Sequence, residues 1–202
     1  MGRWAPDARG RLERAALELY GEHGFDSTTV AEIAERAGLT ERTFFRHFAD
    51  KREVFFFGSP ALQSFLVNEV ENVPAAAAPI ETITSALDAA ATAFFEERRD
   101  FARQRQAIIA ANAELQEREL IKLAALAAAL ADALRRRGVS DPAASLAAEA
   151  GIAIFRIAFG AWAEDAGELT LSEHIRESAN ELRVMTCGQM SALRPRLTIA
   201  LS

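Results

Sequence analysis

The sequence has little of what disulfide-bonded, metal-binding or membrane proteins carry. Cys187 is the single cysteine among 202 residues, which excludes an internal disulfide, and the three histidines are scattered. The longest apolar runs, such as LAALAAALADAL at 123–134, which a charge interrupts, are shorter than the roughly 18 residues that a membrane helix needs. No apolar segment typical of a signal peptide follows the N-terminus. We therefore expect a cytoplasmic protein with no metal, no cofactor and no membrane partner.

Signals for β-strands are equally scarce. Alternation of β-branched residues is rare, Asn-Gly and Asp-Gly turns are absent, and alanine, leucine, glutamate and arginine dominate. The sequence therefore predicts an all-α protein. One helix is expected to begin after Asp50 and to be interrupted at 58–60. Apolar periodicity and capping residues predict the others at about 6–22, 29–37, 40–48, 80–97, 99–111, 113–137, 143–165 and 171–186.

Basic residues are not in excess, but their distribution is uneven. The formal charge is −6, yet residues 1–52 hold nine Lys/Arg and nine Asp/Glu, so all the excess acid lies after them. A local basic surface in this first quarter is therefore compatible with an acidic chain. The quarter contains GLTERTFFRHFADK at 38–51, in which three phenylalanines stand among two arginines, a histidine and a lysine.

Spacing in this stretch separates a buried side from a contact side. Thr29 and Glu32 fit a capping box ahead of one short helix, and Thr40 caps the next. Short helices joined by tight turns are the organisation of a helix-turn-helix. Phe44 and Phe48 are four residues apart and can pack on the preceding helix. The other side chains would form a contact surface, since guanidinium groups bind guanine edges and hydroxyl, imidazole or ammonium groups bind phosphate.

The order of residues in 24–56 resembles the DNA-binding region of the TetR family of transcriptional regulators. The resemblance covers about residues 8–57, and beyond them only length and helical texture agree. Phe45 stands where the family usually has Tyr, so a phosphate-binding hydroxyl is missing, and Arg52 replaces a common acidic residue. The matching positions are Gly24, Phe25, Thr28, Thr29, Val30, Ile33, Ala34, Ala37, Gly38, Thr40, Thr43, Phe44, His47, Phe48 and Lys51.

This resemblance implies two domains and a function. Residues 1–57 would be a three-helix DNA-binding domain, and 58–202 a larger helical domain for ligand binding and dimerisation. The protein would be a repressor that binds a palindromic operator as a homodimer and is released by a small, mainly apolar effector.

The resemblance also implies roles for individual residues. Thr29, His47 and Lys51 would bind phosphate, and Arg42 and Arg46 would be the best readers of guanine, with backbone contact or solvent as the alternative. The full set expected at double-stranded operator DNA is Thr28, Thr29, Thr40, Glu41, Arg42, Thr43, Phe45, Arg46, His47 and Lys51.

The C-terminal helices suggest a subunit interface and a ligand pocket. The helix at 143–165 is apolar on too many sides for one neighbour to cover. We therefore expect Phe155, Phe159 and Trp162 at a dimer interface, with an intrachain core as the alternative. A mostly apolar pocket would be lined by Phe65, Phe94, Phe95, Phe101, Gln106, Ile109 and Asn112, although aromatic residues at helical spacing are more often core.

Two other classes of function deserve weighing against a regulator. An enzyme is disfavoured, because the sequence has no Gly-rich phosphate loop, nucleophile motif or metal cluster. The paired glutamates at 96–97 stand beside arginines rather than in an isolated acid/base pair. A protein-interaction adaptor with a helix-turn-helix shape is disfavoured by the outward arginine, threonine and histidine side chains.

Overall fold

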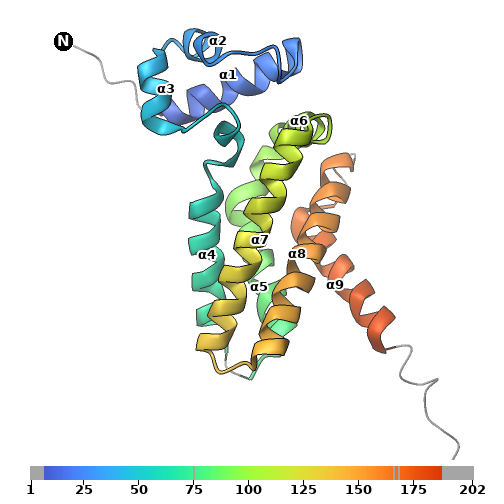
Figure 1. The fold of residues 1–202 in the computed structure, drawn as a ribbon. Helices are drawn as coiled ribbons and strands as arrows, with labels where there is room; N and C mark the ends of the chain where they lie inside the picture. The colour runs from blue at the N-terminus through green and yellow to red at the C-terminus, as the bar shows by residue number, and fades with distance from the viewer. Residues whose placement is uncertain (1–6, 75, 166, 168, 188–202) are drawn as a thin grey trace, which may run out of the picture.

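A computed structural model describes residues 7–74, 76–165, 167 and 169–187, and the described chain contains helices and no strand. The prediction of an all-α protein is confirmed. The α-helices are α1 (Ala8–His23), α2 (Val30–Arg36), α3 (Glu41–His47), α4 (Ser59–Asn72), α5 (Pro79–Ala90), α6 (Arg99–Ala110), α7 (Ala113–Arg136), α8 (Asp141–Glu164) and α9 (Leu171–Cys187) (Figure 1).

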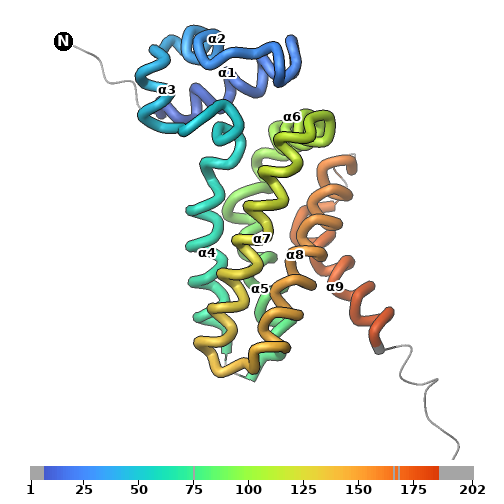
Figure 2. The backbone as a smooth tube through the Cα atoms, in the orientation of Figure 1, coloured from blue at the N-terminus to red at the C-terminus, as the bar shows by residue number. Residues whose placement is uncertain are grey.

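The first three helices form a small unit with its own core. Phe25, Ile33 and Phe44 are buried there, and the capping box of Thr29 and Glu32 starts α2. Gly38, with φ of 65°, makes the turn between α2 and α3, a conformation that side chains other than glycine rarely adopt. A single 3₁₀ turn and α4 then lead the chain into the rest of the molecule (Figure 2).

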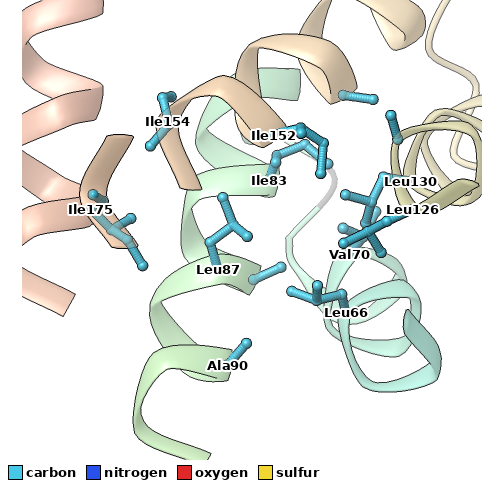
Figure 3. Packing of buried hydrophobic residues seen from close by; sticks show 14 of the residues in the cluster. Leu66, Val70, Ile83, Leu87, Ala90, Leu126, Leu130, Ile152, Ile154 and Ile175 are labelled. Carbon is cyan, nitrogen blue, oxygen red and sulfur yellow. The ribbon is translucent and has the colours of Figure 1, made fainter. Parts of the chain in front are cut away.

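The longer helices α4, α5, α7, α8 and α9 form a second body around a separate core (Figure 1). Leu66 of α4, Leu87 of α5 and Leu130 of α7 point into the space between their helices (Figure 3). Small residues bring these helices close together. A Cβ on Gly151 of α8 would lie 2.2 Å from Cγ2 of Ile83, so α5 and α8 could not pack this closely with any larger residue there.

Two sequence predictions of helices are wrong in detail. The helix predicted at 80–97 is α-helical only to Ala90, and a π-helical turn at Ala91–Phe95 and a 3₁₀ turn at Glu96–Arg98 follow it. The carboxylate of Asp50 does accept from the backbone N–H groups of Arg52 and Glu53. The element that it starts, however, is one 3₁₀ turn, and α4 begins afresh beyond Gly58.

Candidate nucleic-acid interface

α3 turns one side into the core of the N-terminal unit and the other side to solvent. Phe44 is fully buried, whereas Arg42 and Arg46 are exposed. Successive residues of an α-helix are rotated by about 100°, which sets both arginines opposite Phe44. Glu41 and Phe45 flank them on one side, and the half-buried Thr43 and His47 on the other. The outward side of α3 therefore presents two guanidinium groups that could hydrogen-bond an external partner.

The two arginines at the centre of this surface are free to meet an external anion. Neither Arg42 nor Arg46 has an acid partner among the described residues. Two other arginines of this unit are already paired: Arg36 lies 2.9 Å from Glu22, and Arg52 lies 2.6 Å from Asp50. The positive charges of Arg42 and Arg46 are therefore available for contacts outside the chain.

His47 lies beside this positive charge. Partial desolvation lowers the pKa of its imidazole, and the nearby charges of Arg46 and Arg9 lower it further. Nη2 of Arg46 lies 3.5 Å from Nε2 of His47. The imidazole is consequently neutral at pH 7 in the free protein, where one of its ring nitrogens can donate to a phosphate oxygen.

The threonines of the predicted interface divide into exposed and buried ones. The exposed hydroxyl of Thr29 caps α2 at the N–H of Glu32, and that of Thr40 caps α3 at the N–H of Thr43. Thr28 must be corrected, because it is 1% exposed and its hydroxyl donates to the carbonyls of Leu19 and Gly24. A side chain held in this way fastens the end of α1 and does not face a ligand.

Lys51 has an internal role that the sequence did not reveal. Its Nζ donates to the carbonyl oxygens of Phe25 at 2.8 Å, Thr28 at 3.0 Å and Asp26 at 3.2 Å, and it lies 4.3 Å from the centre of the Phe25 ring. An ammonium group has three N–H donors, so these carbonyls use all of them. Contact of Lys51 with phosphate stays a prediction that requires Nζ to release at least one carbonyl.

Of the residues predicted at the dimer interface, Phe159 and Trp162 lie inside the chain, which corrects their assignment, whereas that of Phe155 stays a prediction. Trp162 is 0% exposed, Phe159 is buried, and Phe155 packs half-buried against Phe95 at 5.7 Å between ring centres. A helix that is apolar on all sides does not reveal from its sequence which side faces inward. The outward side of α8 instead carries Leu146, Ala150, Ala153, Ile157, Gly160 and Ala161 at three- and four-residue steps.

The residues predicted to line a pocket are divided between two cores. Phe65, Phe94 and Phe95 belong to one ring cluster on the core of the longer helices, with 5.2 Å between the rings of Phe65 and Phe94. Phe101 and Ile109 instead pack on the core of the N-terminal unit, which corrects their assignment to a pocket.

The two polar members of that predicted pocket are placed as follows. Gln106 is half-buried on α6, and the side-chain amide of Asn112 donates to the carbonyl of Ile108 at 2.6 Å. A groove of about 860 Å³ does lie between α5, α8 and α9, but other residues line it, among them Ile80, Leu146 and Leu182.

An ion pair with one buried member joins α1 of the N-terminal unit to the 3₁₀ turn that precedes α6. The carboxylate of Glu13, which is 8% exposed, lies 2.8 Å from Nη2 of Arg98. Burial raises the pKa of Glu13, and the hydrogen bond and charge of Arg98 oppose this shift. Glu13 stands on the otherwise apolar side of α1, next to Leu12, and this lone acid was the available signal for a charged partner.

Further polar contacts extend this junction between the two parts. Nε of Arg105 on α6 donates to the carbonyl of Phe55 at 3.1 Å. Glu53 accepts from Nζ of Lys122 at 3.0 Å and also pairs with Arg118, both on α7. Displacement of α6 or α7 would therefore act directly on the unit that carries α3.

Comparison with known proteins agrees with this arrangement. Residues 13–56 match the family described as bacterial regulatory proteins, tetR family. The HTH-type transcriptional regulator TcmR of Streptomyces glaucescens is 40% identical over 81 residues, which are 40% of this chain and 36% of TcmR. The HTH-type transcriptional activator FasR of Mycolicibacterium smegmatis is 32% identical over 90 residues, 45% of this chain and 40% of FasR. The chain thus matches less than half the length of these relatives.

Solved structures of the same fold cover nearly the whole chain. A protein of Syntrophomonas wolfei str. Goettingen assigned to the TetR family superposes with a TM-score of 0.62 at 14% identity, covering 96% of this chain and 98% of that one. A complex of SmeT with triclosan has a TM-score of 0.60 at 21% identity, covering 89% and 90%. The N-terminal match and the regulators that share it identify residues 13–56 as the DNA-binding region of the TetR family of transcriptional regulators, and the solved structures share the helical fold of the chain.

Proposed function

We propose that the protein is a transcriptional repressor that binds operator DNA through α3. The observation that carries this proposal is the outward side of α3, where Arg42 and Arg46 have no acid partner in the described chain. A major groove about 12 Å wide admits an α-helix, and arginine forms paired hydrogen bonds with guanine there. Thr29 and Thr40 at the starts of α2 and α3, and His47 at the end of α3, offer groups suited to phosphate.

The repressor would act as a homodimer through α8 and α9. Leu146 and Ile157 of α8 are 71% and 65% exposed, which is unusual for large apolar side chains, and Val184 and Met185 of α9 are also exposed. Two copies of these helices would make a four-helix interface. Because a twofold dimer repeats α3, its operator would be approximately palindromic, with one half-site in each of two successive major grooves.

A small, mainly apolar effector would release the repressor. The ring cluster of Phe65, Phe94 and Phe95 lies where α5 gives way to π and 3₁₀ turns, and such breaks are frequent at functional sites. The same broken segment ends at Arg98, which pairs with Glu13 of the N-terminal unit. A ligand that moved this segment would thereby shift α3 and favour a spacing of the two copies that does not fit the operator. SmeT, of the same fold, was solved in complex with triclosan.

The proposal is tested by selecting bound sequences from a random double-stranded DNA library with the full-length protein. We expect a motif of two inverted half-sites about one helical turn apart. Failure to enrich any sequence would overturn the proposal. Because the relative FasR is an activator, the direction of regulation needs its own test. A reporter gene placed behind the selected site shows whether the protein represses or activates transcription. We expect the protein to repress the reporter in the cytoplasm. Activation of the reporter would contradict the proposal that the protein is a repressor.

A further inference from the structure

Phe45 is an exposed aromatic residue on the proposed reading surface. Its side chain is 55% exposed, and among the described residues of the N-terminal unit it is the sole exposed large hydrophobic. The other exposed large hydrophobics lie on α7, α8 and α9. Burial of an apolar side chain against an apolar group is favourable, so a ring held on this surface can contribute to binding a partner of matching chemistry.

The ring is held in place by the core beneath it. The rings of Phe45 and Phe44 meet edge to face, with centres 5.5 Å apart and planes at 80°. Phe44 is fully buried and fixed in turn by Phe48, at 5.3 Å between ring centres. Phe45 follows Arg42 by three residues, so the two side chains are neighbours on one side of α3. A ring positioned in this way can make a directed contact.

The chemistry of the ring limits what it can recognise on DNA. Phenylalanine has no polar atom, so Phe45 can neither donate to a phosphate nor bind a polar base edge. In the major groove, the C5-methyl of thymine is the apolar group that distinguishes one base pair from the others. We propose that Phe45 is a specificity residue that packs on a thymine methyl, next to the base pair contacted by Arg42.

This inference rests on the proposed DNA-binding function and adds to it. It requires the operator to contain a thymine at one defined position in each half-site, for a reason that hydrogen bonding does not supply. A contact of the ring with sugar or phosphate would instead be indifferent to the base. The two possibilities differ in their response to a single methyl group.

The test uses the operator selected with the wild-type protein, in which each thymine is replaced in turn by deoxyuridine. This change removes only the methyl and keeps every hydrogen-bonding group of the base. We expect wild-type affinity to fall about fourfold for one substituted half-site and roughly fifteenfold for both, as expected for one buried methyl per contact. Phe45→Ala should bind the thymine operator as weakly as the wild type binds the doubly substituted one, and should not distinguish thymine from deoxyuridine.

Two further variants keep the result interpretable. Phe45→Tyr keeps the ring and should keep the sensitivity to the methyl, whereas Arg46→Ala should lose affinity and keep that sensitivity. Far-UV circular dichroism checks that Phe45→Ala is folded, and Phe45→Leu serves in its place if it is not. A wild-type protein that binds its operator with no response at any thymine would overturn the inference. The inference would also be overturned if Phe45→Ala lost the same factor of affinity on the thymine and the deoxyuridine operators, because the variant would then still respond to the methyl. Absence of any operator would instead overturn the proposed function.

Discussion

The two parts of the molecule distribute their side chains in opposite ways. The N-terminal unit buries large aromatic residues such as Phe25, Phe44 and Phe55, and turns unpaired arginines outward on α3. The longer helices pack closely through small residues and leave Leu146 and Ile157 of α8 in solvent. An outward cationic surface suits a polyanion, and an outward apolar stripe suits a second protein surface. The exposed chemistry of each part therefore indicates its partner.

The largest effect is expected inside the second part, at Trp162. Trp162→Ala should lower the free energy of unfolding by about 3–5 kcal/mol, because the fully buried ring would leave a cavity. Urea unfolding at a fixed protein concentration measures this change, since the proposed dimerisation would also contribute to stability. If Trp162→Ala left the free energy of unfolding unchanged and dissociated the dimer, Trp162 would belong to the subunit interface after all.

The outward stripe of α8 should show the reverse behaviour. Ile157→Asp places a charge where two subunits would meet, and should weaken dimerisation by more than about a hundredfold without unfolding the monomer. Leu120→Asp is the matched control, because Leu120 on α7 is 55% exposed outside the stripe. Sedimentation velocity distinguishes monomer from dimer. Dissociation by both variants, or by neither, would contradict this assignment of the interface.

The junction between the two parts is sensitive to loss of one charge. Arg98→Ala leaves the buried carboxylate of Glu13 without its partner and should cost about 1–3 kcal/mol at pH 7. Because burial raises the pKa of Glu13, the carboxyl takes up a proton as the pH falls, and this cost should shrink toward pH about 4.

Glu13→Gln is the control for this prediction, since it removes the charge and leaves the polar shape. The variant should change stability much less than Arg98→Ala does, and its stability should lack the corresponding dependence on pH. Equal losses at pH 4 and pH 7 in Arg98→Ala would show that its methylene groups, and not its charge, stabilise the junction.

A smaller effect is expected from His47 on the reading surface. Desolvation and the charges of Arg46 and Arg9 lower the pKa of His47 in the free protein, and a bound phosphate would raise it. Binding would then take up a proton, so DNA affinity should rise by about threefold as the pH falls from about 8 to about 6. His47→Gln should remove this dependence. If His47→Gln shows the same dependence of DNA affinity on pH as the wild type, a group other than His47 takes up the proton.

Prediction from sequence succeeded where the signals are local. The capping box of Thr29 and Glu32 and the glycine turn at Gly38 define α2 and α3 through neighbouring residues alone. It failed where contacts distant in sequence decide. Lys51 reaches back 26 residues to the carbonyl of Phe25, and the hydroxyl of the buried Thr28 donates to Leu19, nine residues earlier in α1.

The orientation of α8 shows the same limit in the second part. Its sequence is apolar around most of the helix, and its length and composition would even suit a membrane span, with 44% of the most apolar window buried in the protein. Only the packing of α5, α6, α7 and α9 against α8 decides that Trp162 lies inside and Ile157 outside. Residue type alone could not make that distinction, because both side chains are large and apolar.

The most direct test of the account compares two arginines of equal charge in binding to the selected operator. Arg46→Ala should weaken binding to the operator by about 10- to 100-fold and relax the preference at one base pair in each half-site. Arg136→Ala, on the exposed end of α7, should leave the affinity unchanged. Titration of both variants against the operator and a scrambled duplex gives, for each variant, the ratio of its affinities for the two DNAs. If Arg46→Ala retains both the affinity and the preference of the wild type, and Arg42→Ala does so as well, α3 is not the reading helix.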